Sequence, residues 1–306
     1  MSILVTGGAG FIGSHIIDSL IESNLDVISV DNYSAVNSGY VNKAAKYINA
    51  DILSNSIENV FQNHSIDYCI HLAAQASVNN AIKDPINDAY INILGSLNII
   101  KLCKKYGCKK IIAASSAAVY GNPQELPIQE SHTTEPLSQY GLSKITMEKY
   151  IQLSGIPYII CRFSNVYGER QTSHGEAGVV SIFDYAMKKN NQVYIDGDGM
   201  QYRDFIYVRD VADIINKIIK SHVNNEIINI STGNTCSINQ LFQYMKTIYH
   251  YDYRPIYRDE RKGDIRHSVL DNSKICSILK SYSYTNIEDG IENLYKFSTQ
   301  GGRAIV

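Results

Sequence analysis

The chain has 306 residues, of which 44% are hydrophobic and 19% are charged, and its formal net charge is −2. This length is enough for one large core or for two joined lobes. The near balance of charge, without a long run of one sign, argues against a nucleic-acid groove or a membrane-surface patch. The apolar start is only as long as a strand and no run approaches a membrane span, so we expect a cytoplasmic protein without membrane attachment. The six cysteines lack the paired spacing of metal ligands, and we expect buried free thiols and no metal site.

The first expected strand, Ile3–Val5, runs into the glycine-rich turn Thr6–Gly13, and an amphipathic helical pattern follows. Glycines there let the main chain approach a pyrophosphate, and the helix N-terminus supplies N–H groups and a partial positive charge. The next apolar run ends in Asp31, 18 residues past Gly13, where a carboxylate would accept hydrogen bonds from an adenosine ribose. Because an acid at this point repels a 2′-phosphate, the pattern predicts NAD binding; the alternative is a tight structural turn.

Short β-branched runs alternate with helical patterns through the first half of the chain, which predicts a doubly wound α/β domain with a parallel sheet. A helix is expected over Ile86–Tyr106, since Pro85 stands at its start and Gly107 just past its end. From residue 168 onward the pattern loosens, so we predict a Rossmann domain over 1–167 and a smaller α/β substrate lobe over 168–306, with a return to the first domain around 204–232. The expected strands are Ile3–Val5, Val27–Val30, Lys46–Asn49, Tyr68–Leu72, Lys110–Ala114 and Tyr158–Phe163.

A serine pair, Ser115 and Ser116, follows the fifth expected strand, and Tyr140 and Lys144 open a later helix. Tyr140 and Lys144 are four residues apart, so they share one helical face. An ammonium beside a phenol favours the phenolate and lowers the phenol pKa. Such a phenolate can take a proton from a substrate hydroxyl, with a serine hydroxyl bridging the two. For the Tyr/Lys spacing alone, a solvated surface pair is the alternative.

At this point the chain resembles the extended short-chain dehydrogenase/reductase superfamily, the NAD-dependent epimerases and dehydratases of nucleotide sugars. The resemblance covers nearly the whole chain. It is carried by Thr6–Gly13, His71–Ala74, Ser115–Gly121, Tyr140–Lys144, Arg162–Gly168, Arg203–Ile206 and Arg261–Asp264.

For the cofactor, the resemblance implies a set of contacts along the carboxyl edge of the sheet. Gly7, Gly10, Phe11, Ile12 and Gly13 would contact the pyrophosphate. Asp31 and Asn32 would contact the adenosine ribose, and Asp51 and Ile52 would flank the adenine. The nicotinamide half would be lined by Leu72, Ala73, Ala74, Asn92 and Phe163. Ser116 would be the catalytic hydroxyl, Tyr140 the base, and Lys144 its electrostatic partner and a ribose ligand.

For the substrate, the resemblance implies a UDP-sugar held mainly by the second lobe. Arg203 and Arg261 would bind the diphosphate and Asp264 the second ribose, while Asn165, Val179 and Val180 would contact the nucleotide or the sugar. For any single arginine the alternative is a surface charge, and we interpret Arg266 in that way.

The two residues after Ser116 bear on the reaction. Dehydratases of the superfamily place an Asp-Glu pair there, and its decarboxylases an acidic residue, whereas this chain has Ala117 and Ala118. The resemblance therefore favours 4-epimerisation of a UDP-hexose through a 4-keto intermediate, as between UDP-glucose and UDP-galactose. Ser268 stands where some UDP-glucose 4-epimerases have a bulky gate, so N-acetylated UDP-sugars are expected to fit as well; the alternative is a small residue in a turn. Gln139 replaces a frequent proline and predicts a looser helix entry.

Two other classes of function stay open. One is another nucleotide-sugar oxidoreductase, decarboxylase or dehydratase with the same Ser/Tyr/Lys set. The other is a regulator that binds NAD without turnover. The resemblance also implies a homodimer through the helices 86–106 and 139–154, whose apolar residues Ile91, Leu94, Ile145 and Tyr150 are alternatively buried within one copy.

Overall fold

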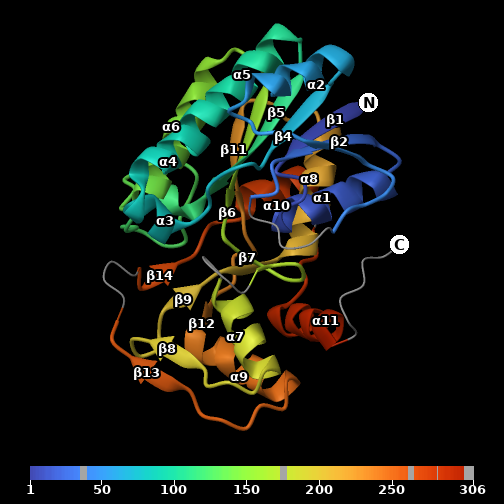
Figure 1. Cartoon of the computed structure of the whole chain (residues 1–306). Helices are drawn as coiled ribbons and strands as arrows, with labels where there is room; N and C mark the ends of the chain where they lie inside the picture. The colour runs from blue at the N-terminus through green and yellow to red at the C-terminus, as the bar shows by residue number, and fades with distance from the viewer. Residues whose placement is uncertain (35–39, 173–177, 261–264, 281, 300–306) are drawn as a thin grey trace.

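A seven-stranded parallel sheet forms the centre of the larger part of the molecule in this computed structural model, which describes residues 1–34, 40–172, 178–260, 265–280 and 282–299 (Figure 1). The strand order is β11-β6-β5-β4-β1-β2-β3, so the chain starts in the middle of the sheet and winds outward in both directions. This order confirms the predicted doubly wound α/β class. The strands are β1 (Ser2–Thr6), β2 (Asp26–Asp31), β3 (Lys46–Asn49), β4 (Tyr68–His71), β5 (Lys110–Ser116), β6 (Tyr158–Phe163) and β11 (Glu226–Ile230).

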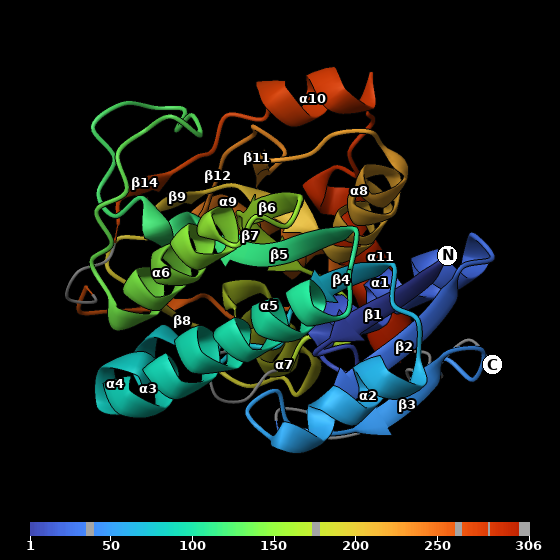
Figure 2. The same cartoon turned by 90° about the horizontal axis from the view of Figure 1, so that it is seen from above.

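Helices cover both faces of this sheet, as Figure 2 shows from above. Because side chains alternate along a strand, Ile3 and Val5 of β1 pack into one core layer and Leu4 into the other. The first layer is closed by α1 (Phe11–Glu22), α8 (Val208–Lys220) and α10 (Ser273–Leu279). The second is closed by α2 (Glu58–Asn63), which follows the short turn η1 (Asn55–Ile57), and by α5 (Ser96–Lys105) and α6 (Gln139–Leu153).

The single helix expected over 86–106 is interrupted in the structure. It consists of α4 (Pro85–Ala89), a π-helical stretch η2 (Tyr90–Gly95) and α5, with Gly107 at a φ of +71° just past the end. The wider turn brings Gly95 against Ile52, where a Cβ would lie 2.5 Å from the Ile52 Cδ1 atom. π-helical turns are frequent at functional sites, and this one carries the inward-facing Asn92. A short helix, α3 (Val78–Lys83), precedes α4.

A smaller lobe lies below the sheet in Figure 1 and has its own core of aromatic and aliphatic side chains, among them Phe183, Leu241 and Phe242. Its helices are α7 (Val179–Lys188), α9 (Ile238–Ile248) and α11 (Ile287–Thr299). Its short sheets pair β12 (Cys236–Ser237), β9 (Tyr202–Arg203) and β14 (His267–Ser268), and β13 (Ile256–Arg258) with β8 (Tyr194–Asp196). A further pair, β7 (Asn165–Tyr167) with β10 (Phe205–Tyr207), joins the two parts.

The segment between residues 208 and 230 belongs to the large sheet although it follows the lobe in sequence. Helix α8 packs on α1, and β11 pairs with β6 in parallel. The division at 167/168 stays a prediction. All six cysteines are free, and five of them are buried. In the described part of the chain, no helix has the length and apolar character needed to cross a bilayer.

A buried histidine makes the fold sensitive to acid. His71 on β4 lies between the hydroxyls of Thr6 and Ser96, at 2.7 Å from the Nδ1 atom and 2.9 Å from the Nε2 atom. Burial, and then the charge of Lys144, lowers the pKa of His71 to about 3. The folded state therefore holds a neutral ring, while the unfolded chain takes up a proton below about pH 6.5.

We expect this histidine to add about 1.4 kcal/mol per pH unit to the loss of unfolding free energy as the pH falls from 6 to 5. Above about pH 6.5 His71 costs no stability, because the ring is neutral in both the folded and the unfolded chain. The loss begins only when the unfolded chain binds a proton that the folded state excludes. Urea unfolding at several pH values measures the slope, which should become shallower in His71→Gln. The exposed His222 is the control, since His222→Gln should leave the slope unchanged. Equal slopes for His71→Gln and wild type would contradict this account.

Candidate active site

The glycine-rich turn lies between β1 and α1, at the carboxyl edge of the sheet. Gly7 has a φ of +71°, and a Cβ there would lie 2.8 Å from the Ala73 nitrogen, so the turn packs closely on the loop after β4. A Cβ on Gly13 would lie 2.2 Å from the Gly7 carbonyl oxygen. Both glycines are therefore required by the chain itself.

Gly10 is different, because the described residues leave the space beside it largely open. Among their atoms, and apart from its chain neighbours, a Cβ at Gly10 would have one neighbour within 4 Å, the Gly7 oxygen at 3.2 Å. Gly10 is also the N-cap of α1, which begins without a side-chain cap and without an acidic residue in its first turn. An open cradle at an uncapped helix N-terminus fits the pyrophosphate of a dinucleotide. Phe11 and Ile12, for which pyrophosphate contacts remain a prediction, stand in that first turn.

The carboxylate of Asp31 stands at the end of β2, facing the same turn. Its Oδ2 atom accepts a hydrogen bond from the Ala9 nitrogen at 2.9 Å, and its Oδ1 atom accepts one from the Tyr33 nitrogen at 2.8 Å. Each oxygen keeps a second lone pair that can accept a ribose hydroxyl. The geometry therefore suits the role predicted for Asp31.

The residues predicted near the adenine divide into two kinds. Asn32 donates to the Asp51 Oδ2 atom at 2.8 Å, which brings these two predicted contacts together in an exposed position. The side chain of Ile52 instead belongs to the core between sheet and helices, and 6% of the residue is exposed. Its carbonyl accepts a hydrogen bond from the Asn98 amide.

On the other side of the turn, the loop Leu72, Ala73 and Ala74 is half-buried and held from beneath by Asn92. The Asn92 Oδ1 atom accepts from the Gln75 nitrogen at 2.9 Å, and its Nδ2 atom donates to the Gln75 carbonyl at 2.9 Å. With 1% of its surface exposed, Asn92 acts on this loop from inside the protein. Phe163, also predicted near the nicotinamide, is a core residue that pairs with Ser116 at the end of β6.

Ser116, Tyr140 and Lys144 meet at the carboxyl end of β5. Ser116 is the last residue of the strand and hydrogen-bonds with Tyr140 on α6. The Lys144 Nζ atom donates to the Ala114 carbonyl at 3.1 Å and lies 5.9 Å from the centroid of the Tyr140 ring. The structure thus brings the three predicted catalytic side chains into one cluster.

The close approach of α6 to this strand end depends on Gly141, which directly follows Tyr140. A Cβ there would lie 2.6 Å from the Ala118 carbonyl oxygen. The entry of the helix is capped, since the Ser138 hydroxyl accepts from the Gly141 nitrogen at 3.1 Å. The looser entry expected from Gln139 is therefore not observed, because Ser138 supplies the cap that anchors the first turn.

A buried ion pair holds α6 to the sheet, and we did not predict it. The guanidinium of Arg162 on β6 binds both carboxylate oxygens of Glu148 on α6, at 3.0 and 2.7 Å, and the Ser115 hydroxyl donates to the same carboxylate at 2.5 Å. Bidentate pairs of this kind fix geometry as well as charge. The sequence contained a signal: Arg162 is the only charge in an apolar strand, and Glu148 follows Lys144 by one helical turn.

The ionisation of the cluster is set by burial. Burial raises the pKa of Tyr140 to about 12 and outweighs the hydrogen bond with Ser116, which lowers it. Burial also lowers the pKa of Lys144 to about 8, against the opposing effect of the Asp88 and Glu148 carboxylates. The prediction that Lys144 depresses the phenol pKa is wrong for this state of the protein, because the loss of phenolate hydration dominates. At neutral pH Tyr140 keeps its proton and Lys144 is mostly charged.

The predicted substrate residues are distributed between the joining strands and the lobe. Arg203 on β9 and Ser268 on β14 are direct partners in neighbouring parallel strands. The Asn165 amide donates to the Asp204 carbonyl at 3.1 Å. Val179 begins α7 and is half-buried, whereas the side chain of Val180 belongs to the core of the lobe. Arg261 and Asp264 lie outside the described residues.

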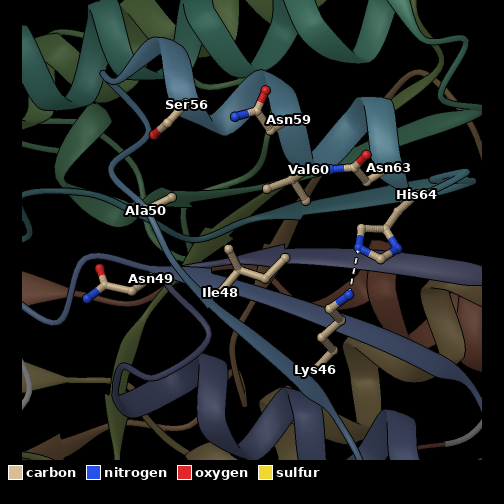
Figure 3. A pocket seen from close by; sticks show the side chains of 9 residues that line it. All are labelled: Lys46, Ile48, Asn49, Ala50, Ser56, Asn59, Val60, Asn63 and His64. Atoms are coloured by element: carbon tan, nitrogen blue, oxygen red, sulfur yellow. Dashed lines mark hydrogen bonds between the residues drawn. The ribbon is translucent and has the colours of Figure 1, made fainter.

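Two other features lie apart from this cluster. Arg266 forms an exposed ion pair with Asp198 at 2.8 Å, in agreement with its interpretation as a surface charge. A separate pocket with a volume of about 540 Å³ lies between the edge strand β3 and α2, and its described lining includes none of the predicted site residues (Figure 3). At one end of it the Lys46 Nζ atom is 3.0 Å from the Nε2 atom of His64.

Comparison with known proteins agrees with this geometry. Residues 3–231 match the model of the NAD dependent epimerase/dehydratase family. A UDP-glucose 4-epimerase of Thermotoga maritima, solved with UDP-glucose, is 40% identical with a TM-score of 0.95, covering 98% of this chain and 99% of that chain. A UDP-N-acetylglucosamine 4-epimerase of Methanobrevibacter ruminantium, in complex with UDP-N-acetylmuramic acid, is 33% identical with a TM-score of 0.90, covering 98% of each chain. A UDP-glucose 4-epimerase of Thermus thermophilus in complex with NAD is 32% identical with a TM-score of 0.91, covering 98% of this chain and 100% of that chain.

The contrast between Gly10 and Gly13 can be tested directly. We expect Gly10→Ala to fold with a denaturation midpoint close to that of wild type but to bind NAD at least about tenfold more weakly, because its methyl group enters the open cradle. Gly13→Ala should instead lower the denaturation midpoint, since its Cβ collides with the Gly7 carbonyl. Thermal unfolding and calorimetric titration with NAD measure both effects. An unchanged NAD affinity in a folded Gly10→Ala protein would show that the pyrophosphate does not bind at this turn.

Proposed function

Because the chain belongs to the NAD-dependent epimerase/dehydratase family, we propose that it catalyses the NAD-dependent 4-epimerisation of a UDP-hexose through a 4-keto intermediate. The observation that carries this proposal is the cluster of the half-buried Ser116 and Tyr140 with the buried Lys144, followed by Ala117 and Ala118. The structural relatives named above are UDP-sugar 4-epimerases, and one of them is a complex with NAD.

The residues present fit the cofactor. The open cradle at Gly10 and the carboxylate of Asp31 would hold its adenosine diphosphate half, and the loop Leu72–Ala74 would line its nicotinamide half. When bound, NAD supplies an acceptor for the C4 hydride of the sugar and afterwards returns that hydride.

The chain's own part in the reaction is proton transfer. Tyr140 takes the proton of the sugar 4-hydroxyl as the C4–H bond breaks, and gives it back when the 4-keto group is reduced on its other face. The Ser116 hydroxyl is hydrogen-bonded to Tyr140 and bridges it to the sugar oxygen. Since burial holds the phenol pKa at about 12, the anion needs positive charge close by, and the Lys144 ammonium lies over the same ring.

The neighbours of Ser116 support epimerisation over dehydration or decarboxylation. Ala117 and Ala118 form the turn η3 (Ala117–Val119), and neither side chain can transfer a proton. Loss of water from C5 and C6 requires an acid and a base in addition to Tyr140. We therefore expect a 4-keto sugar formed at this site to be reduced again at C4, without loss of water or carbon dioxide.

For the sugar itself, we propose that both UDP-glucose and UDP-N-acetylglucosamine are accepted. Ser268 is half-buried and adjacent to Arg203, a predicted diphosphate contact, so a small side chain stands where a bulky one would restrict the sugar. The likeness to the Methanobrevibacter ruminantium enzyme supports the larger sugar, and the likeness to the Thermotoga maritima enzyme supports the smaller.

We also propose that two copies pair through the outer face of α4, η2 and α6. Large apolar side chains are exposed there: Ile86, Tyr90, Leu94, Leu142, Tyr150 and Leu153, with exposed fractions from 44% to 83%. Ile91 and Ile145, predicted for the same face, instead pack within the chain. An exposed apolar face of this kind is typical of a protein interface.

An assay of the conversion of UDP-galactose to UDP-glucose, without added reductant, tests the reaction. Wild type should turn over with NAD alone, and Tyr140→Phe should lose about 100-fold or more in kcat, because its ring cannot accept the hydroxyl proton. The exposed Tyr253 provides the control, as Tyr253→Phe should retain wild-type activity. Binding of NAD without turnover in wild type would favour the regulator, and a dehydrated product would favour the other enzyme class.

The role of Ser268 in sugar choice is separable from catalysis. We expect Ser268→Tyr to reduce kcat/KM for UDP-N-acetylglucosamine by about 10-fold or more while UDP-glucose is affected much less, since a phenol fills the space for the acetamido group. Ser268→Ala keeps that space and should act on both sugars like wild type. Parallel assays with the two sugars measure the ratio, and an equal loss on both would overturn this assignment.

A further inference from the structure

Asp88 is a buried acid at the candidate active site that the proposed reaction does not use. It lies on α4 with 1% of its surface exposed, on the side that packs against α6. Its Oδ1 atom accepts hydrogen bonds from the Asn92 and Gln75 side-chain amides, both at 2.9 Å. Burying a carboxylate costs free energy unless its charge is compensated, so its place here needs an explanation.

The hydrogen bonds of Asp88 connect the two sides of the catalytic cluster. On one side, Gln75 follows directly after the loop Leu72–Ala74. On the other, the Asn92 amide also donates to the Ser143 hydroxyl at 3.1 Å, and Ser143 donates to the Tyr140 carbonyl at 2.9 Å. Ser143 immediately precedes Lys144. The carboxylate therefore anchors both the loop and the turn of α6 that carries the catalytic side chains.

The other titratable groups near the Lys144 ammonium show that Asp88 is the carboxylate without a cationic partner of its own among the groups named here. The titratable groups that face Lys144 are Asp88 on α4, Glu148 and Tyr140 on α6, and His71 on β4. Glu148 is already paired with Arg162 at 2.7 Å, and the His71 ring is neutral. Within the residues that the structure describes, the hydrogen bonds to the Asp88 carboxylate come from neutral amides, and Asp88 favours the charged form of Lys144 through its electrostatic effect on the Lys144 pKa.

We propose that Asp88 is a positioning residue of this site, whose carboxylate orients Asn92 and Gln75 and supplies the counter-charge that keeps the Lys144 ammonium protonated. This role rests on the proposed function, because Lys144 matters as the cation beside the Tyr140 phenol. Asp88 acts through these neighbours, and no contact with substrate is required of it.

Asp88→Asn separates the charge from the hydrogen bonds, since the amide oxygen can still accept from Asn92 and Gln75. Removing a nearby negative charge destabilises the ammonium and stabilises the phenolate, so both groups lose their protons at lower pH. The pH profile of kcat should therefore move to lower pH by about one unit with its shape retained. Asp88→Ala, which loses the hydrogen bonds as well, should in addition lower the maximum of the kcat profile.

The matched control is Asp84→Asn, the same chemical change on the exposed end of the same helix. Asp84 caps α4 by accepting from the Asn87 nitrogen at 3.0 Å, and asparagine caps equally well, so the profile should stay at the wild-type position. A uniform loss of kcat in Asp88→Asn without a shift of the profile would show a structural role and overturn the proposal. A wild-type profile and rate would overturn it too.

A second readout is independent of the proposed activity. The side-chain carbon next to the Lys144 nitrogen, labelled with ¹³C in the full-length protein and assigned through Lys144→Arg, reports its titration by NMR. Asp88→Asn should shift this titration to lower pH by about one unit, while Asp84→Asn should not. If the Lys144 titration in Asp88→Asn stays at the wild-type pH, Asp88 does not act as the counter-charge of Lys144. Inactivity of wild type towards UDP-sugars would instead contradict the proposed function, and the NMR comparison distinguishes the two failures.

Discussion

The buried ion pair between Glu148 and Arg162 holds helix α6 against the sheet. Arg162 projects from β6, Glu148 from α6, and the Ser115 hydroxyl from the neighbouring β5 completes the carboxylate's hydrogen bonds. Burial opposes the charge on Arg162, but the hydrogen bonds to Glu148 raise the pKa of Arg162, so the guanidinium stays charged. Removing one partner of such a pair typically costs about 3–5 kcal/mol, because the other is left buried and unpaired. The register of Tyr140 and Lys144 against Ser116 follows from this attachment.

Close backbone approaches complete the arrangement around that helix. Gly7 lies against the Ala73 main chain and Gly141 against the Ala118 carbonyl, at distances that leave no space for a side chain. These contacts bring the turn after β1, the loop after β4 and the end of β5 to one edge of the sheet. Asn92, presented by the π-helical stretch, supports the loop from beneath. The site is thus positioned by main-chain packing and by buried polar groups.

The same burial sets the chemistry of the site. It holds a proton on Tyr140, weakens the hold of Lys144 on its own proton, and keeps His71 neutral. In such an environment each added charge has a large effect, because little water screens it. Asp88 and Lys144 are best understood together for this reason, as two buried side chains whose electrostatic interaction little solvent screens.

The sequence by itself determined the class of fold, six strands of the large sheet to within two residues at either end, and the glycine-rich turn between β1 and α1. These depend on local patterns: β-branched runs, glycine spacing, and the acid at the end of the second strand. Tertiary structure alone decided the break in the helix expected over 86–106, the ionisation of Tyr140, and the burial of Ile52, Val180 and Ile145. It also decided the partners of Glu148 and Asp88. The physical reason is that π-helical turns, buried charges and desolvation depend on which distant segments pack together. Local sequence patterns do not specify such long-range contacts.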